Sequence, residues 1–125
     1  MNKDPMSALW DIVKSLADDI EIYKEVMDED ENSMPDSYIL LRTDMSNSVA
    51  MSGDGGARIR QSDCDIILVT KGTATRTTDL HNINKAKVEE VLGDMHYDSY
   101  NLGYDPSMKV SQHTWNLTIN YIKEN

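Results

Sequence analysis

The chain has 125 residues and a formal net charge of −10, from 12 Lys and Arg against 22 Asp and Glu. Its length fits one domain with a single modest core. Sequence-independent binding to nucleic acid needs Lys and Arg that neutralise phosphates, so this acidity argues against a general nucleic-acid binder. No apolar run approaches the roughly 20 residues of a membrane helix. The single cysteine, Cys64, excludes an internal disulfide, and the first residues lack a secretory signal pattern, so we expect a soluble protein made inside the cell.

The first expected element is a helix from Met6 to Met27. Asp4 or Ser7 can cap it, and Pro5 suits its first turn. Its apolar residues recur at three- and four-residue steps, which places them on one helix face. They are Leu9, Ile12, Val13, Leu16, Ile20, Tyr23 and Met27.

An acidic loop and a strand pair are expected next. Residues 28–36 begin with four consecutive acidic residues, which favour a solvated loop. Tyr38–Thr43 is typical of a strand, with Val49–Met51 as a possible short partner. The glycines at 53, 55 and 56 permit positive φ angles. Residues 45–57 are therefore expected to form a flexible hairpin loop.

The most strand-like run is Arg58–Thr70. Its second half, Ile66–Val69, is apolar on both faces, which indicates a central strand covered by a helix. Its first half is polar. We therefore expect this half to extend beyond the core as one arm of a long hairpin.

A second helix is expected from Asp79 to Leu92, after a polar linker at Thr73–Thr78 and before a capping glycine, Gly93. Periodicity assigns its buried face to the apolar residues Leu80, Ile83, Val88, Val91 and Leu92.

The end of the chain predicts two more strands. Met95–Leu102 is the weaker, followed by an expected turn at Gly103–Pro106. In the last strand Trp115, Leu117, Ile119 and Tyr121 alternate with polar residues, the pattern of a half-buried strand. The whole pattern predicts a single α+β domain. It has an N-terminal helix, an antiparallel or mixed sheet of four to five strands, and a second helix packed on one face.

Few residues have the spacing that catalysis or metal binding needs. His81, His96 and His113 are scattered, so each is expected to be an ordinary surface or boundary residue. Cys64 has no activating partner in sequence and is expected to be an inert thiol. The glycine-rich segment lacks the Lys-Ser/Thr of a phosphate loop and the alternating acids of a calcium loop. No catalytic residue, metal or cofactor is predicted.

Asp63 and Asp65 are the one pair of carboxylates with a suggestive spacing. Residues two apart in a strand point the same way, so the pair could hold a divalent ion. The alternative is that they meet Arg42, Arg58 or Arg60 across strands or across a subunit boundary. A metal-dependent nuclease would need a further acid at position 69, which is Val69.

The order of these elements resembles the tail-terminator and tail-completion (head–tail joining) proteins of long-tailed bacteriophages. The resemblance spans residues 6–122. Besides the N-terminal helix, it rests on the segments Tyr38–Arg42, Arg60–Gly72, Val88–Leu92, Asn101–Tyr104 and Trp115–Tyr121.

This resemblance implies a non-enzymatic virion protein in the tail or neck, present in the host cytoplasm during assembly. It implies a homohexameric ring that docks on the last ring of the tail tube, stops tube growth and meets the head connector. DNA would pass through the lumen without specific binding, with no membrane partner. The expected subunit or tube contacts lie in residues 46–56 and the polar half-strand, namely Met51, Asp54, Arg58, Arg60, Asp63 and Asp65.

Two other functions are compatible with the residues. The first is an acidic cytoplasmic adaptor or inhibitor that binds a single protein partner through its acidic surface. The second is a small metal-dependent enzyme that uses Asp63 and Asp65.

Overall fold

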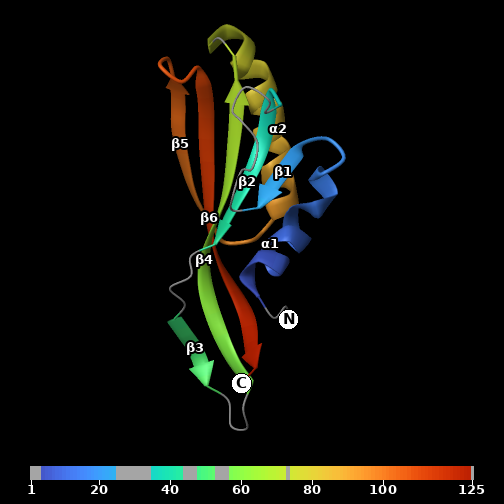
Figure 1. The fold of residues 1–125 in the computed structure, drawn as a ribbon, viewed down its shortest axis with the longest axis vertical. Helices are drawn as coiled ribbons and strands as arrows, with labels where there is room; N and C mark the ends of the chain where they lie inside the picture. Colours follow the sequence, from blue (N-terminus) through green and yellow to red (C-terminus); the bar gives the residue numbers. More distant parts are fainter. Residues whose placement is uncertain (1–3, 25–34, 44–47, 53–56, 73, 125) are drawn as a thin grey trace.

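The structure is a computed structural model that describes residues 4–24, 35–43, 48–52, 57–72 and 74–124. Two α-helices, one short 3-10 helix and six strands follow one another along these residues (Figure 1). The elements are α1 (Pro5–Val13), η1 (Lys14–Leu16), β1 (Glu21–Lys24), β2 (Ser37–Thr43), β3 (Ser48–Ser52), β4 (Ala57–Lys71), α2 (Ala74–Leu92), β5 (Asp98–Asp105) and β6 (Val110–Glu124).

The strands form one open, mixed sheet. Five strands lie in the order β1-β2-β4-β6-β5, and β3 pairs with β4 outside this path. β1 is parallel to β2, and the other pairings are antiparallel. The predicted fold class, a single α+β domain with a mixed sheet and a helix on one face, is confirmed.

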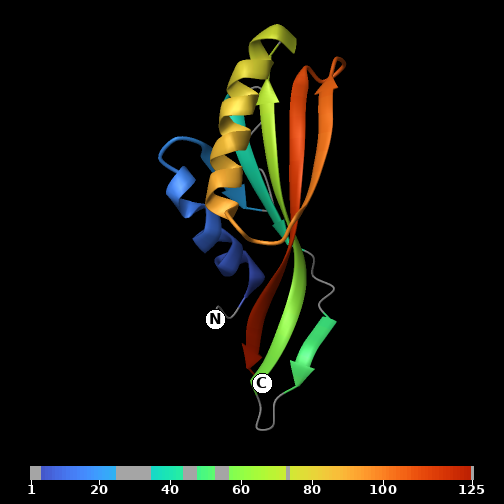
Figure 2. The same ribbon diagram turned by 180° about the vertical axis from the view of Figure 1, so that it is seen from behind.

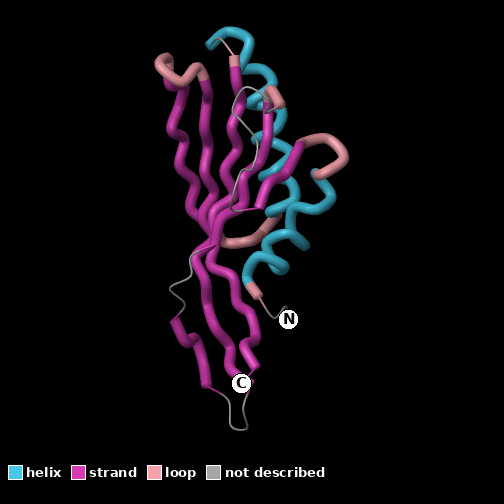
Figure 3. The backbone as a smooth tube through the Cα atoms, in the orientation of Figure 1, coloured by secondary structure: helices cyan, strands magenta, loops and turns pink. Residues whose placement is uncertain are grey.

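The central strands β4 and β6 are the longest elements of the sheet. Every residue of β4 from Ala57 to Lys71 pairs with β6. In Figure 3 this pair continues past the helices as an arm, with β3 beside it. The predicted strand at Arg58–Thr70 and its central position are therefore confirmed. Val49–Met51 lies in a strand as expected, but this strand, β3, pairs with β4 and not with the Tyr38–Thr43 strand that was its expected partner. The strand β3 occupies part of the region that was expected to be a hairpin loop.

The core lies between the sheet and the two helices (Figure 2). Alternate residues of β4 and β6 face the helices, and Ile66, Leu68 and Trp115 are fully buried there. Leu9 and Val13 of α1 and Val88 and Leu92 of α2 belong to the same cluster. We call the opposite side of the sheet the open face, because neither helix covers it. Neither helix in the described part of the chain is long and apolar enough to cross a lipid bilayer.

The N-terminal helix is much shorter than predicted. Asp4 caps it as expected, since its carboxylate accepts a hydrogen bond of 2.8 Å from the Ser7 amide. The helix ends at Val13, and Glu21–Lys24 is a strand. Tyr23 fits the helical stripe by its spacing, but it lies in a strand because β1 pairs in parallel with β2. Met27 lies outside the described residues, as does most of the expected acidic loop.

The second helix begins earlier than predicted, at Ala74, so the expected linker at Thr73–Thr78 is wrong from residue 74 onward. Its buried face also differs, because Leu80 is 38% exposed and Ile83 is 54% exposed. His81 and Asn84 are buried in their place. Gly93 ends the helix as predicted, with a φ of 55° that favours glycine.

The strand β5 lies further along the chain than predicted, at Asp98–Asp105. Gly103 to Asp105 belong to this strand, and the turn that joins it to β6 covers residues 106–109. The last strand is confirmed, with Trp115, Leu117, Ile119 and Tyr121 all buried.

Candidate functional site

A polar cluster occupies the middle of the open face, where two predicted site residues lie. Arg42 of β2 donates a hydrogen bond of 2.9 Å to Oδ2 of Asp65 on β4. Asn116 of β6 donates to Oδ1 of the same carboxylate at 2.9 Å. Asp63 accepts a hydrogen bond of 3.3 Å from Thr118. The predicted pairing of Asp65 with Arg42 across strands is thus confirmed.

This arrangement does not favour a metal ion at the Asp65 carboxylate. Both oxygens of Asp65 already accept hydrogen bonds from side chains on the neighbouring strands. Among the described residues, no group of three or more His, Cys, Asp or Glu side chains lies close enough to hold a metal ion. The cluster instead ties β2, β4 and β6 together on a face that has no helix to cover it.

The other predicted contact residues lie toward the arm. Met51 is in β3 and pairs with Ile59 of β4. Arg58 pairs with Lys123 and Arg60 with Tyr121, both of β6. The structure does not describe the side chains of Met51, Arg58 and Arg60, and Asp54 lies outside the described residues. The backbone thus brings Met51, Arg58 and Arg60 to the arm, while Asp63 and Asp65 lie where the arm meets the core.

An apolar groove of about 510 Å³ lies on the open face, at the other end from the arm. Its charged lining residues in the described chain are two lysines, Lys71 and Lys109. The uncharged residues that line it are Tyr38 and Leu40 of β2, Ile67, Val69 and Gly72 at the end of β4, and Met108, Val110 and Gln112 near the start of β6.

A tight turn fixes the lysine end of this groove. Lys109 has a φ of 55°, an uncommon conformation for a residue with a side chain. Its amide donates to the Asp105 carbonyl at 2.7 Å, and its carbonyl accepts from the Gly72 amide at 3.0 Å. The Tyr104 hydroxyl also donates to the Gly72 carbonyl. The ends of β4 and β6 are therefore joined, which holds Lys71 and Lys109 at one rim.

A buried polar cluster lies on the opposite side of the sheet, beneath α2. Nδ1 of His81 lies 2.9 Å from the Thr70 hydroxyl, which lies 3.1 Å from the Ser37 hydroxyl. Asn84 donates to Ser37 at 2.8 Å. Burial, with smaller contributions from the charge of Lys85 and from His113, lowers the pKa of His81 to about 4. His81 is therefore neutral at pH 7.

The second buried histidine, His113 of β6, lies in the same region. Its Nε2 is hydrogen-bonded to the Ser99 hydroxyl of β5, and its ring centroid lies 4.4 Å from that of Trp115. Burial and the nearby Lys85 lower its pKa as well. The interpretation of His81 and His113 as surface or boundary residues was wrong, since they are 7% and 4% exposed. His96 is exposed, as expected.

The pair formed by His81 and Thr70 has the composition of a base and a hydroxyl nucleophile. Thr70 is fully buried, however, and His81 nearly so, so a substrate cannot reach the hydroxyl in this structure. Cys64 is also fully buried, between strands of the core. We interpret the buried cluster as the polar attachment of α2 to the sheet.

Two sequence signals indicate this cluster in retrospect. His113 lies two residues before Trp115 and so shares its buried face of β6. His81 precedes Asn84, Val88 and Leu92 by three, seven and eleven residues, which places all four on one side of α2.

The comparisons with known proteins give no relative. The chain matches no family model, and no curated protein sequence matches it.

Proposed function

We propose that this protein is a structural component of a long-tailed phage virion, of the tail-terminator or head–tail joining type. It forms a ring at the end of the tail tube. The observation that carries the proposal is the length of β4 and β6, which stay paired well past the helices and carry β3 on the resulting arm. The open face, which neither helix of the described chain covers, gives further support.

Ring assembly requires two different surfaces that fit each other, because a closed ring has head-to-tail contacts. An arm that leaves the body of the subunit can reach a neighbouring copy or the tube, where strand edges offer backbone hydrogen bonds. Met51, Arg58 and Arg60 lie on this arm. Arg58 and Arg60 would form charge-assisted pairs with acids of a neighbouring protein.

The charge of the chain supports the same proposal. At a net charge of −10, a ring of several copies is strongly acidic and repels the phosphates of DNA. DNA would then slide through the lumen without binding to it. Tight retention of DNA by assembled rings at low salt would contradict this part of the proposal.

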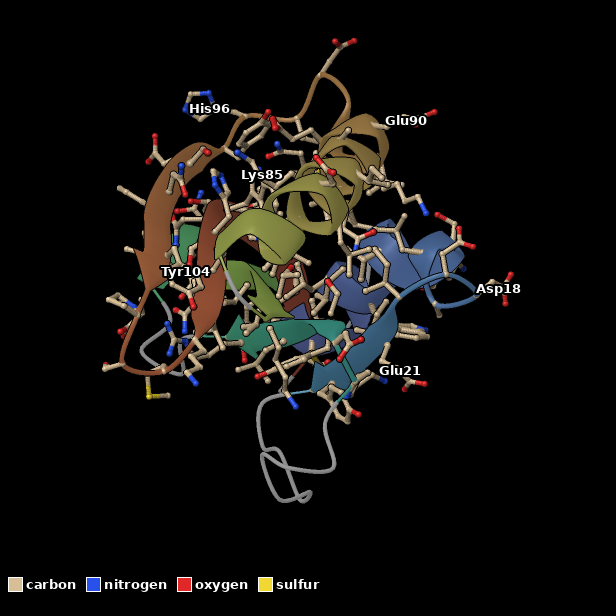
Figure 4. All side chains as sticks on the ribbon, turned by 90° about the horizontal axis from the view of Figure 1, so that it is seen from above. Asp18, Glu21, Lys85, Glu90, His96 and Tyr104 are labelled. Atoms are coloured by element: carbon tan, nitrogen blue, oxygen red, sulfur yellow. The ribbon has the colours of Figure 1, made fainter. Side chains whose placement is uncertain are left out.

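A second candidate function is an acidic adaptor or inhibitor that binds a single protein partner. The observation in its favour is a set of acids that point outward from the domain, among them Asp18, Glu21 of β1 and Glu90 of α2 (Figure 4). A 1:1 complex with a host enzyme, formed by a single copy of the chain, would favour this function over the ring.

A tube-growth assay tests the proposed function. The tail tube protein of the phage that encodes this chain is polymerised with and without the purified protein. We expect tubes of limited length with the protein bound at one end. Tubes of unchanged length with bare ends would overturn the proposal.

A further inference from the structure

Among the described residues, three buried side-chain nitrogen atoms beneath α2 have no hydrogen-bond partner. They are Nε2 of His81, Nδ1 of His113 and Nε1 of Trp115. Both histidines are more than nine-tenths buried, and Trp115 is fully buried. A polar atom that leaves water without gaining a hydrogen bond costs free energy, so buried polar atoms almost always have a partner. Three such atoms in one small domain therefore need an explanation.

The three nitrogen atoms belong to side chains that lie in one region, between α2 and β6. The ring centroids of His113 and Trp115 are 4.4 Å apart. His81 reaches the same region from α2, because its Nδ1 lies 2.9 Å from the hydroxyl of Thr70, which pairs with β6 two residues before His113. The charge of Lys85 lowers the pKa of both histidines, so both rings lie near the same ammonium group.

The hydrogen bonds on the other side of His81 indicate which of its nitrogens carries the hydrogen. Asn84 donates to the Ser37 hydroxyl, which leaves the hydrogen of Ser37 for the Thr70 hydroxyl 3.1 Å away. Thr70 then donates to Nδ1 of His81, and the ring hydrogen lies on Nε2. Nε2 of His81 and Nε1 of Trp115 are thus two donors that need an acceptor.

His113 supplies the complementary group. Its Nε2 is hydrogen-bonded to the Ser99 hydroxyl, and when Nε2 donates there, Nδ1 is an acceptor. Two donors and one acceptor match one water molecule, since a buried water typically makes about three hydrogen bonds to polar groups that the protein leaves unpaired. We propose that a single buried water molecule binds beneath α2 and bridges His81, His113 and Trp115. It accepts from His81 and Trp115 and donates to His113.

A metal ion does not fit the same place. The indole nitrogen of Trp115 keeps its hydrogen and is a donor only, which leaves two imidazole nitrogens as ligands. A structural zinc site needs about four ligands, and the part of the chain that the structure describes has no group of three or more ligating side chains. The charge of Lys85 also repels a cation from this region.

The water joins two hydrogen-bonded groups that are otherwise separate. One group contains Ser37 of β2, Thr70 of β4 and His81 of α2, and the other contains His113 of β6 and Ser99 of β5. Once they are joined, a polar chain crosses beneath α2 from one side of the sheet to the other. This inference concerns the interior of one subunit and does not depend on the proposed ring.

A high-resolution crystal structure of the full chain tests the site directly. We expect a water oxygen within about 2.7–3.2 Å of all three nitrogen atoms. A structure in which these nitrogens bond to protein groups, or in which no water lies between them, would overturn the proposal.

Solution NMR adds a test with a variant. In the wild type, the indole hydrogen of Trp115 should show a nuclear Overhauser effect to a long-lived water, and the ring-nitrogen shifts should place the hydrogen of both histidines on Nε2. His113→Phe keeps an aromatic ring but removes the acceptor, so the water signal should fall several-fold. The control, His96→Phe, replaces an exposed histidine and should keep the signal.

Two NMR results would contradict the bridging water. The first is an unchanged water signal in His113→Phe, and the second is a ring hydrogen on Nδ1 of His81 in the wild type. If His113→Phe does not fold, the wild-type ring-nitrogen shifts and the crystal structure decide the question.

Discussion

The stability of this protein should fall between pH 6.5 and pH 4 because His81 is buried in its neutral form. Its pKa is about 4 in the folded chain, against 6.5 in the unfolded chain. Between these values the unfolded state binds the extra proton, so the free energy of unfolding decreases as the pH falls. At 1.36 kcal/mol per pKa unit, the full loss is about 3 kcal/mol. This loss is complete once the pH is below the pKa of His81 in the folded chain.

The structure gives the physical reason for this loss. A proton on His81 would place a charge beneath α2, close to Lys85 and next to His113, whose pKa is lowered in the same direction. His113 should add to the loss over the pH range below its ordinary pKa.

Urea unfolding at a series of pH values measures this effect. The His81→Gln variant cannot take up the proton, so its stability should depend less on pH than that of the wild type. Between pH 4 and 6.5, the number of protons that the chain takes up on unfolding should be lower than in the wild type by up to one. The control is His96→Gln, which replaces an exposed histidine and should unfold as the wild type does. An unchanged pH dependence in His81→Gln would refute the reasoning.

Three further predictions concern single residues. Asp4→Ala removes the cap of α1 and should cost about 1 kcal/mol of unfolding free energy in urea titrations, whereas an unchanged midpoint would contradict the cap. Gly93→Ala places a Cβ at a φ of 55° and should cost roughly 1–2 kcal/mol, measured in the same way; equal stability would argue against this conformation. Asp65→Asn should cost at most about 1 kcal/mol, because Arg42 is well exposed. Calorimetry with Mn²⁺ should show no heat that depends on Asp65, and such heat would restore the metal hypothesis.

The parts of the fold that the sequence predicts well are those with local signals. The alternation around Trp115 predicts β6, the apolar run Ile66–Val69 predicts a central strand, and Gly93 marks the end of α2. In each case the pattern and the tertiary contacts favour the same structure. The pairing of Asp65 with Arg42 was also among the expectations, because strands that neighbour each other bring such charges together.

The errors occur where tertiary contacts decide between local alternatives. Tyr23 fits the helical stripe by its spacing, and the parallel pairing of β1 with β2 places it in a strand instead. In α2 the periodicity assigned Leu80 and Ile83 to the core. The polar groups of Thr70 and Ser37 on the sheet instead favour the burial of His81 and Asn84, which supply hydrogen-bond partners.

The groove was not predicted from the sequence. Residues from three strands and the β5–β6 turn line the groove, so no single segment carries its pattern.

Electron microscopy tests the central claim, that this chain acts by assembling with copies of itself, most directly. The purified protein is imaged alone and after incubation with tail tubes of a long-tailed phage, the partner that the proposed function requires. The account predicts six-fold annular particles, free in solution or seated on one end of each tube. Fields without rings, together with tubes whose ends stay bare, would contradict it.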